Sequence, residues 1–217
     1  MKVKLVSYTK PVIEEADSLD ELIAYVARVS NPSNQHNKET ADKLVNYLVK
    51  HKHFSPLEMA NACFEIETTR DIARQILRHR SFSFQEFSQR YANVKDIGLF
   101  ELREARLQDH KNRQNSIETD DRILQADWEI KQMELMNKSE SVYKWAINNG
   151  IAKEQARAVL PEGITPSRMY MNGSLRSWLH YIEVRTDPST QKEHREVAQE
   201  IQRQLIELAP NIFGVEK

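Results

Sequence analysis

The stretch of chain from residue 78 to residue 91, RHRSFSFQEFSQRY, gathers the side chains most capable of chemistry. Five arginines fall between positions 70 and 90, and no lysine lies among them. A guanidinium group grips a phosphate or a carbonyl edge through two parallel hydrogen bonds, which an ammonium group cannot do. Serines, glutamines and a glutamate are interleaved with these arginines. The pattern favours a polar site for an anion over arginines that merely satisfy the carbonyl groups of a helix end.

Aromatic side chains alternate with the polar ones in the same run. Phe82, Phe84, Phe87 and Tyr91 could stack on a nucleobase or a flavin ring, although core packing is the commoner role of such residues. Glu86 could accept a hydrogen bond from a ribose hydroxyl or a base N–H. The alternative is an ordinary ion pair with a neighbouring arginine.

A helix expected over residues 70–79 would position the start of this run. Arg70, Arg74 and Arg78 recur at i, i+4 and i+8 and would share one stripe, opposite an apolar face that includes Ile72 and Ile76. Gln75, three residues before Arg78, would be close enough to share a ligand with it, while Arg80 and Arg90 would follow in a loop.

The remaining pattern predicts an α+β fold in one domain over residues 1–217. The segment at 95–121 is polar and weakly periodic, which is typical of a functional flap or an oligomer contact. Elsewhere, alternation and helical periodicity are separated by capping residues, and strands do not alternate with helices as in parallel α/β proteins. The expected strands cover residues 2–9, 60–68 and 165–172, and the other expected helices cover 18–30, 38–50, 122–149, 152–160, 174–184 and 189–208.

Composition argues against several classes of protein. The formal net charge of −1 disfavours a protein that binds nucleic acid mainly through the phosphate backbone. None of the five glycines is spaced as in a dinucleotide-binding turn or a P-loop. Cys63 is the single cysteine, which excludes an internal disulfide. No apolar stretch is long enough to span a membrane and no signal core begins the chain, so we expect a cytoplasmic protein.

The run at 78–91 resembles the RHRxxSxxExSxR signature of flavin-dependent thymidylate synthases, with Gln85 in place of the usual asparagine. Three further stretches resemble the family in the same order and spacing, so that the resemblance covers nearly the whole chain. The insert at 108–116 is similar to the viral and phage branch. The three stretches are HKHFSPLE at 51–58, ARAVLP at 156–161, and the segment from Asn172 through Arg176 and His180 to Arg185.

The resemblance implies the family's fold, a small and mostly antiparallel sheet packed against several helices. It also implies reductive methylation of dUMP to dTMP, with methylenetetrahydrofolate as carbon donor and FADH2, regenerated by NADPH, as hydride donor. It further implies a homotetramer, in the cytoplasm (of the host, for a virus), with neither a nucleic acid polymer nor a membrane as partner.

The site residues implied by the resemblance form three sets. The catalytic set is Arg185, His53 and Ser88. FAD would contact Ser55, Arg78, His79, Arg80, Glu86, Ser174, Arg176 and His180, where Ser174 and His180 stand at positions often held by asparagine. The substrate dUMP would contact Gln75, Arg78, Glu86, Phe87, Ser88, Gln89, Arg90, Arg185, and Arg157 from another subunit.

Arg185 is the residue expected to activate the substrate. In the family this arginine lies over the uracil carbonyl and N3, where a fixed cation stabilises the N3-deprotonated pyrimidine and raises the electron density at C5. C5 could then attack the methylene carbon without prior addition of a cysteine to C6. Cys63, on an apolar strand without a basic neighbour, is expected to be structural.

Two other functions compete with this interpretation. One is an RNA-binding module that uses the interleaved arginines and phenylalanines, which the near-neutral charge disfavours. The other is a metal hydrolase using His51, His53 and Glu58, since His-x-His is a common ligand spacing on a strand. Bound flavin, visible as a yellow colour, would distinguish an enzyme of the resembling family from both.

Overall fold

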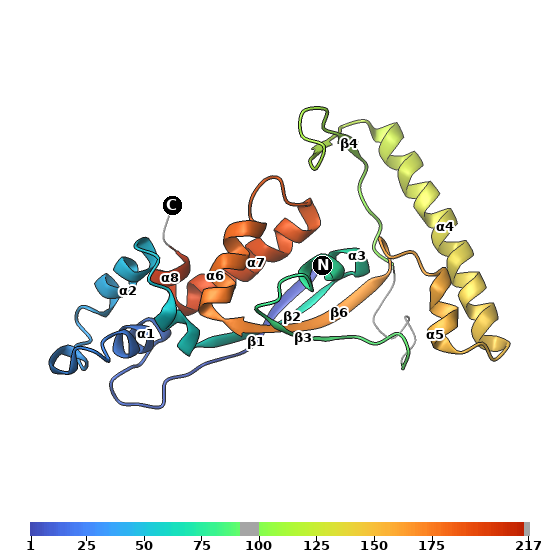
Figure 1. Ribbon diagram of the computed structural model, residues 1–217. Helices are drawn as coiled ribbons and strands as arrows, with labels where there is room; N and C mark the ends of the chain where they lie inside the picture. The colour runs from blue at the N-terminus through green and yellow to red at the C-terminus, as the bar shows by residue number, and fades with distance from the viewer. Residues whose placement is uncertain (92–99, 215–217) are drawn as a thin grey trace.

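A four-stranded antiparallel sheet forms the centre of the molecule (Figure 1). The computed structural model describes residues 1–91 and 100–214. The strand order β1-β2-β6-β3 places β6 between two strands that precede it by many residues in the chain. The α+β prediction is confirmed. The strands are β1 (Lys2–Tyr8), β2 (Asn61–Thr69), β3 (Ser83–Glu86) and β6 (Pro166–Ser174).

One face of the sheet is buried against three helices, α3 (Arg70–Ile76), α6 (Leu175–Arg185) and α7 (Lys192–Leu208) (Figure 1). Phe64 and Ile66 of β2 and Met171 of β6 are fully buried beneath them, as the alternation of the expected strand at 60–68 predicts. Trp178 of α6 packs edge-on against Phe64 and donates a hydrogen bond from Nε1 to the Ala62 carbonyl oxygen, 3.0 Å away. These contacts hold α6 in one position over the sheet.

Two strand–helix junctions bring the ends of α3 and α6 to the site. Each helix begins directly after its strand, α3 after β2 and α6 after β6. Ser174 is the N-cap of α6 and its Oγ accepts a hydrogen bond from the Ser177 N–H. The helix expected at 70–79 is three residues too long, because α3 ends at Ile76 and the chain turns there. Arg78 therefore lies in the turn and not on the stripe of Arg70 and Arg74.

Arg80 and Arg90 lie in turns as expected, but residues 83–86 between them pair with β6 as strand β3, which the sequence analysis missed. Phe82, just before β3, belongs to the core and packs edge-on against Trp178. A Cβ added to Gly173 of β6 would meet the Phe82 ring at 2.4 Å, so the strand can approach this ring only because residue 173 is glycine. Tyr91, in contrast, is exposed.

Three further helices close one end of the sheet. Helix α1 begins after its predicted N-cap, Ser18, whose Oγ accepts from the Glu21 N–H. Helix α2 begins three residues later than expected, because the chain before it forms a turn in which the Thr40 N–H donates to Asn37 Oδ1 and Arg28 donates to Thr40 Oγ1. These helices are α1 (Leu19–Ala27), α2 (Ala41–Lys50) and α8 (Pro210–Phe213), accompanied by 3-10 turns η1 (Pro32–Asn34) and η2 (Ser55–Met59).

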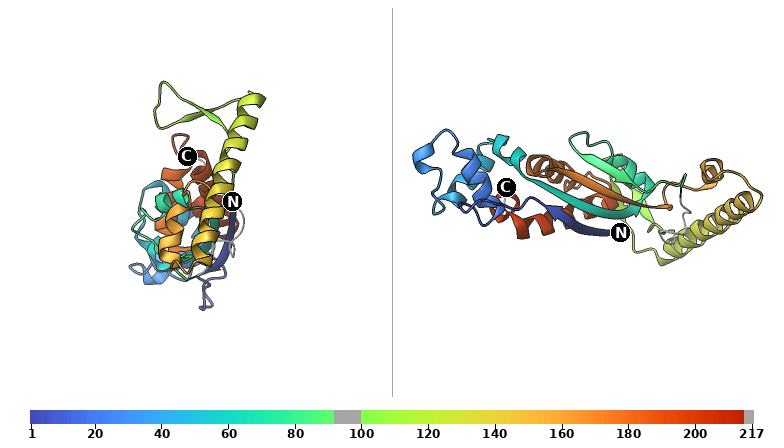
Figure 2. Two further views of the ribbon diagram at one scale, coloured as in Figure 1. Left: turned by 90° about the vertical axis from the view of Figure 1, so that its right-hand side faces the viewer. Right: turned by 90° about the horizontal axis from the view of Figure 1, so that it is seen from below.

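A hairpin and a long helix extend away from the sheet (Figure 2). The segment expected to be irregular contains the hairpin of β4 (Arg106–Gln108) and β5 (Ser116–Glu118), which corrects the prediction for residues 100–121; residues 95–99 lie outside the described residues. Helix α4 (Arg122–Asn148) matches its prediction to within one residue, and Gly150, whose φ is +78°, follows its C-cap Asn149.

The expected helix at 152–160 is only partly α-helical. It divides into α5 (Lys153–Ala156) and the 3-10 turn η4 (Arg157–Val159). Leu160 has extended backbone angles because Pro161 follows it, and a residue before proline is disfavoured in the helical region. Ala156 packs with Tyr143 and Ala146 of α4 in a small apolar cluster of its own.

Candidate active site

The turn after α3 and the end of α6 bring two of the predicted site residues into direct contact. Arg185, in the last turn of α6, donates a hydrogen bond from Nε to His79 Nε2 at 2.8 Å. The His79 ring also packs edge-on against Tyr181, one turn earlier on α6. These residues are 106 positions apart in the chain, and the sheet register brings them together.

The electrostatics of this pair leave the arginine charge uncompensated. Burial, reinforced by the charge of Arg185, lowers the pKa of His79 to about 4, so the imidazole is neutral near pH 7 and its unprotonated Nε2 can accept. Burial also lowers the pKa of Arg185. Within the described residues, no carboxylate pairs with Arg185. The guanidinium is thus held in place by a neutral partner and keeps its positive charge for another ligand.

A second group of predicted residues lies along η2 and the start of α6. Arg176 pairs with Glu58 at 2.9 Å. Ser177 Oγ donates to the Ser81 carbonyl oxygen at 3.3 Å, which joins α6 to the turn at residues 77–81, called the RHR turn below. Ser174 is buried and uses its hydroxyl as the helix cap. Ser55, His53 and His180 are exposed, and His53 packs edge-on against Tyr47.

Arg78 and Arg80 are exposed beside this group. Neither forms an ion pair within residues 1–91 and 100–214. Two exposed guanidinium groups without a carboxylate partner among the described residues are chemically suited to the phosphates of a dinucleotide such as FAD.

The C-terminal end of the run at residues 78–91, called the RHR run below, forms a third group with α5. Glu86 accepts from Ser167 Oγ at 2.7 Å and lies 3.8 Å from Arg70. Gln89 is buried, and its Nε2 has no hydrogen-bond partner among the described residues. A buried amide N–H without an acceptor is costly and marks a place where a ligand can bind.

Arg90 pairs with Glu154 of α5 at 3.2 Å, and Arg157 follows one turn after Glu154. Phe87 and Ser88, which precede Arg90 in the chain, are half-buried. Within the described part of the chain, no hydrogen bond or ion pair joins Arg90 or Arg157 to Gln75, His79 or Arg185.

Sequence reasoning missed a buried histidine beneath the first group. His194 of α7 is fully buried; its Nδ1 lies 3.3 Å from Gln75 Oε1 and its Nε2 lies 3.0 Å from the Tyr181 hydroxyl. Gln75 in turn donates from Nε2 to Gln191 Oε1 at 2.7 Å. A signal was available, because His194 continues the apolar stripe of Val197, Ala198 and Ile201 along the expected helix.

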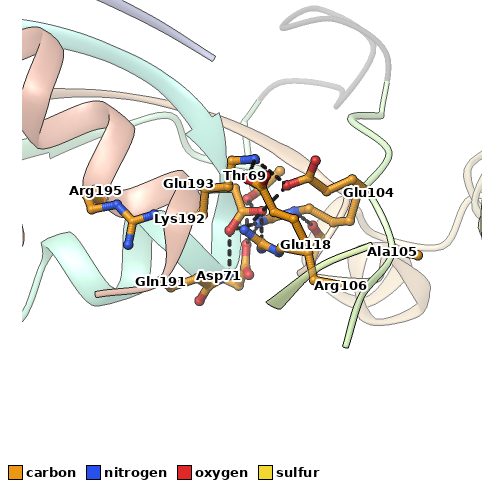
Figure 3. Close-up of polar contacts among 12 residues, drawn as sticks. Thr69, Asp71, Glu104, Ala105, Arg106, Glu118, Gln191, Lys192, Glu193 and Arg195 are labelled. Atoms are coloured by element: carbon orange, nitrogen blue, oxygen red, sulfur yellow. Dashed lines mark hydrogen bonds and ion pairs between the residues drawn. The ribbon is translucent and has the colours of Figure 1, made fainter. Parts of the chain in front are cut away.

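A network of charged side chains joins the β4–β5 hairpin to α7 beside this histidine (Figure 3). Arg103 and Arg106 both pair with Glu193, at 2.9 and 2.5 Å. Burial alone would raise the pKa of Glu193, but the hydrogen bond from Arg106 and the charges of both arginines lower it to about 2. Arg103 also pairs with Asp71, and Lys192 with Glu104 and Glu118.

A cavity of about 700 Å³ lies between this hairpin and α7. Arg103, Arg106 and Lys192 line it, and each already has carboxylate partners. Arg113 and Arg195 line it as well, and Arg195 donates to the backbone carbonyl oxygens of Pro188 and Thr190.

The residues of the metal-hydrolase alternative do not gather into one cluster. Within the described residues there is no group of three or more His, Cys, Asp or Glu side chains that could hold a metal ion, and the rings of His51 and His53 are 6.3 Å apart. No helix among those residues is long and apolar enough to cross a membrane. Cys63 lies on β2, and burial raises the pKa of its thiol, which disfavours the reactive thiolate.

Comparison with known proteins identifies the family. The family model described as "Thymidylate synthase complementing protein" matches residues 5–211. The chain is 49% identical to a probable flavin-dependent thymidylate synthase of Paramecium bursaria Chlorella virus 1, covering 98% of this chain and 97% of that protein. It is 48% identical to the flavin-dependent thymidylate synthase of Synechocystis sp., covering 91% of each.

A solved structure agrees with the sequence comparison. A UMP/dUMP methylase from Streptomyces cacaoi, crystallised with 5-Br dUMP, superimposes with a TM-score of 0.81 at 25% identity, covering 98% of this chain and 93% of that one. The fold, the paired Arg185 and His79, and these relatives lead to one conclusion: the chain belongs to the family of flavin-dependent thymidylate synthases.

Proposed function

We propose that this enzyme converts dUMP to dTMP by reductive methylation, with methylenetetrahydrofolate as the carbon donor and NADPH as the reductant of its flavin. The observation that carries the proposal is the uncompensated charge of Arg185, held by neutral His79 at 2.8 Å. The dUMP methylase of S. cacaoi, which has the same fold, supports the choice of pyrimidine nucleotide.

Arg185 acts on the uracil ring. Its guanidinium stabilises the negative charge that deprotonation at N3 places on the carbonyl oxygens and lowers the pKa of N3–H. A carboxylate partner would cancel this effect, whereas the neutral imidazole of His79 orients the guanidinium without reducing its charge. C5 of the pyrimidine is then electron-rich enough to attack the methylene carbon.

The residues at the start of α6 and in the RHR turn fit FAD. Arg78, Arg80 and Arg176 offer guanidinium groups for its phosphates, and His79, Glu86 and His180 with Ser55 and Ser174 offer smaller polar contacts. When bound and reduced, the flavin supplies a hydride. His53 would contribute on the side of the flavin where the folate binds. Because the Ser174 hydroxyl already caps α6, the contact of this residue with FAD is left to its backbone.

The sugar and phosphate of dUMP bind at the other end of the RHR run. Arg90 and Arg157 supply positive charge, and the unpartnered Nε2 of Gln89 supplies a donor that now lacks an acceptor. Phe87 and Ser88 line the same segment, with Ser88 close to the reacting centre. Because no direct contact within the described residues joins this group to Arg185, we propose that a complete site includes Arg157 of another subunit.

The enzyme needs no cysteine nucleophile in this mechanism. Cys63 is the single cysteine, it lies on the strand β2, and its thiol pKa is raised by burial. Activation by Arg185 replaces the covalent addition that a thiolate would otherwise make at C6 of the pyrimidine.

Self-association as a homotetramer completes the proposal. Helix α4 exposes large apolar side chains, including Trp128, Leu135 and Trp145, which a partner subunit would cover. We place the enzyme in the cytoplasm, or in the host cytoplasm if the source is a virus.

The decisive experiment compares the wild type with Arg185→Ala. The variant should retain FAD, seen as a yellow protein with flavin absorption, and should lose dTMP formation by about a hundredfold or more, as for removal of one charge-stabilising group. Arg203→Ala, on the exposed face of α7, is a matched control that should leave turnover unchanged. Near-normal turnover in Arg185→Ala, or a wild type that takes up no flavin, would overturn the proposal.

A further inference from the structure

Four hydrogen bonds run in one line from the hairpin network to the core beneath Arg185. Glu193 accepts from Gln191 Nε2 at 3.0 Å, and Gln191 Oε1 accepts from Gln75 Nε2 at 2.7 Å. Gln75 Oε1 faces His194 Nδ1 at 3.3 Å, and His194 Nε2 faces the Tyr181 hydroxyl at 3.0 Å. Each side chain between Glu193 and Tyr181 uses one donor and one acceptor.

The direction of this line is set at one end by Glu193. With a pKa of about 2, the Glu193 carboxylate is ionised and can only accept hydrogen bonds. Gln191 must therefore offer its NH2 group to Glu193 and its oxygen to Gln75. The same logic then requires Gln75 to offer its NH2 group to Gln191 and its oxygen to His194.

The same constraint fixes the protonation of His194. Facing an amide oxygen, Nδ1 must carry the proton, and Nε2 is left to accept from the Tyr181 hydroxyl. A doubly protonated ring is disfavoured because burial, followed by the charges of Arg185 and His79, lowers the pKa of His194 to about 3. The neutral Nδ1–H form thus satisfies both neighbours of the ring.

We propose that His194 and Glu193 are positioning residues that hold the Gln75 amide in one orientation toward the pyrimidine ring of dUMP. The inference rests on the proposed function and on the contact with dUMP that the family resemblance implies for Gln75. A glutamine amide turns over easily because its two ends are nearly the same size. Here the fixed ends of the line remove that freedom, so that one N–H and one oxygen lone pair of Gln75 remain for the ligand.

The test uses the flavin-loaded enzyme and three substitutions at one position. In His194→Asn, the side-chain NH2 occupies the place of Nδ1 and can still donate to Gln75. In His194→Gln, the amide lies one bond further out, near the place of Nε2, and His194→Phe fills the volume without any donor. We expect dUMP affinity to fall on the order of tenfold in His194→Phe and His194→Gln, and to stay within about threefold of wild type in His194→Asn.

A double-mutant cycle separates positioning from general loss of structure. If His194 acts through Gln75, the variant Gln75→Ala/His194→Phe will bind dUMP no more weakly than Gln75→Ala alone. The control variant is Tyr25→Phe, which removes a phenol hydroxyl on α1, far from His194 in the chain, and should leave dUMP affinity unchanged. Thermal unfolding reports whether each variant folds. If His194→Phe does not fold, Glu193→Gln removes the fixed acceptor instead, and its effect on dUMP affinity should likewise vanish in the Gln75→Ala background.

The outcomes distinguish the two levels of the argument. A wild type that binds no dUMP would refute the proposed function. A wild type that binds dUMP, together with additive effects of the Gln75 and His194 substitutions or equal affinities for His194→Asn and His194→Phe, would refute the positioning role and leave the proposed function intact.

Discussion

Arg185 and His79 show how a half-buried arginine can be oriented without being neutralised. Most buried guanidinium groups are paired with carboxylates, which hold them firmly but cancel their charge. The imidazole of His79 instead supplies one lone pair at 2.8 Å, and its pKa of about 4 keeps the ring neutral. The cost is that both groups depend on the surrounding α6 and α7 to stay desolvated.

This arrangement makes stability depend on pH. The pKa values of His194 and His79 fall from 6.5 in the unfolded chain to about 3 and about 4 in the folded protein, so the unfolded state binds more protons below pH 6.5. The stability that these groups contribute is fully present above pH 6.5 and is lost as the pH falls toward 4. Urea unfolding at pH 7.5, 6.0 and 5.0 should show this decline. His194→Asn should reduce its slope, and an unchanged slope would contradict the assignment.

Cys63 provides a second test at the scale of single residues. Because its thiol lies on β2 with a raised pKa, we expect Cys63→Ala to keep dTMP formation within about twofold of wild type. The measurement is steady-state turnover together with the absence of a covalent adduct by mass spectrometry. Lost activity in a folded variant would restore a covalent mechanism.

At the scale of elements, the contact between Gly173 and Phe82 positions the RHR turn. Strand β6 passes close to the Phe82 ring, and Phe82 follows directly on the turn that contains His79 and Arg80. Gly173→Ala should lower the free energy of unfolding by about 1–3 kcal/mol and weaken FAD retention, because the added methyl group displaces the ring.

Gly163→Ala is the matched control for this substitution, since a Cβ there meets no atom within 4 Å. Chemical unfolding and flavin release during dialysis measure the two effects. Equal behaviour of the two alanine variants would show that the close approach has no role in holding the turn.

The sequence predicts most elements but not how they meet. Local signals were sufficient for the Ser18 cap, the alternation of β2 and the Gly150 end of α4. Strand β3 was missed because its partner β6 lies far along the chain and its alternating residues also suit a ligand site. The chemistry of Arg185 could be inferred from the family pattern. Its neutral partner and the line from Glu193 to Tyr181 could not, because the contacts of Arg185 with His79 and of Gln75 with Gln191 and His194 join residues more than a hundred positions apart.

At the scale of the whole molecule, α4 lies apart from the main core and carries exposed apolar residues (Figure 2). The outer face of the sheet is also half exposed, with Glu65 and Tyr170 hydrogen-bonded at 2.5 Å across it. Surfaces of this kind are typical of subunit interfaces. The separation of Arg90 and Arg157 from Arg185 within one chain is consistent with a site shared between subunits.

Charges on α4 should therefore dissociate the assembly. Ile123 and Ile130 lie two turns apart on one side of the helix and are 76% and 50% exposed. The double variant Ile123→Glu/Ile130→Glu should sediment as smaller species and lose activity while keeping its helical circular dichroism. Ser141→Glu, a charge at an exposed polar position of α4, should do neither. An active tetramer in the double variant would place the interface elsewhere.

The hydrogen bonds that end at Glu193 also set a rule for exchanging parts between relatives. The hairpin segment supplies Arg103 and Arg106, α7 supplies Glu193 and Gln191, and α3 supplies Gln75. A chimera whose new hairpin segment lacked these two arginines would leave Glu193 without the cations that lower its pKa, and a protonated Glu193 would no longer dictate which way the two amides point. Hairpin, α3 and α7 therefore form one transferable unit, although they are scattered along the chain.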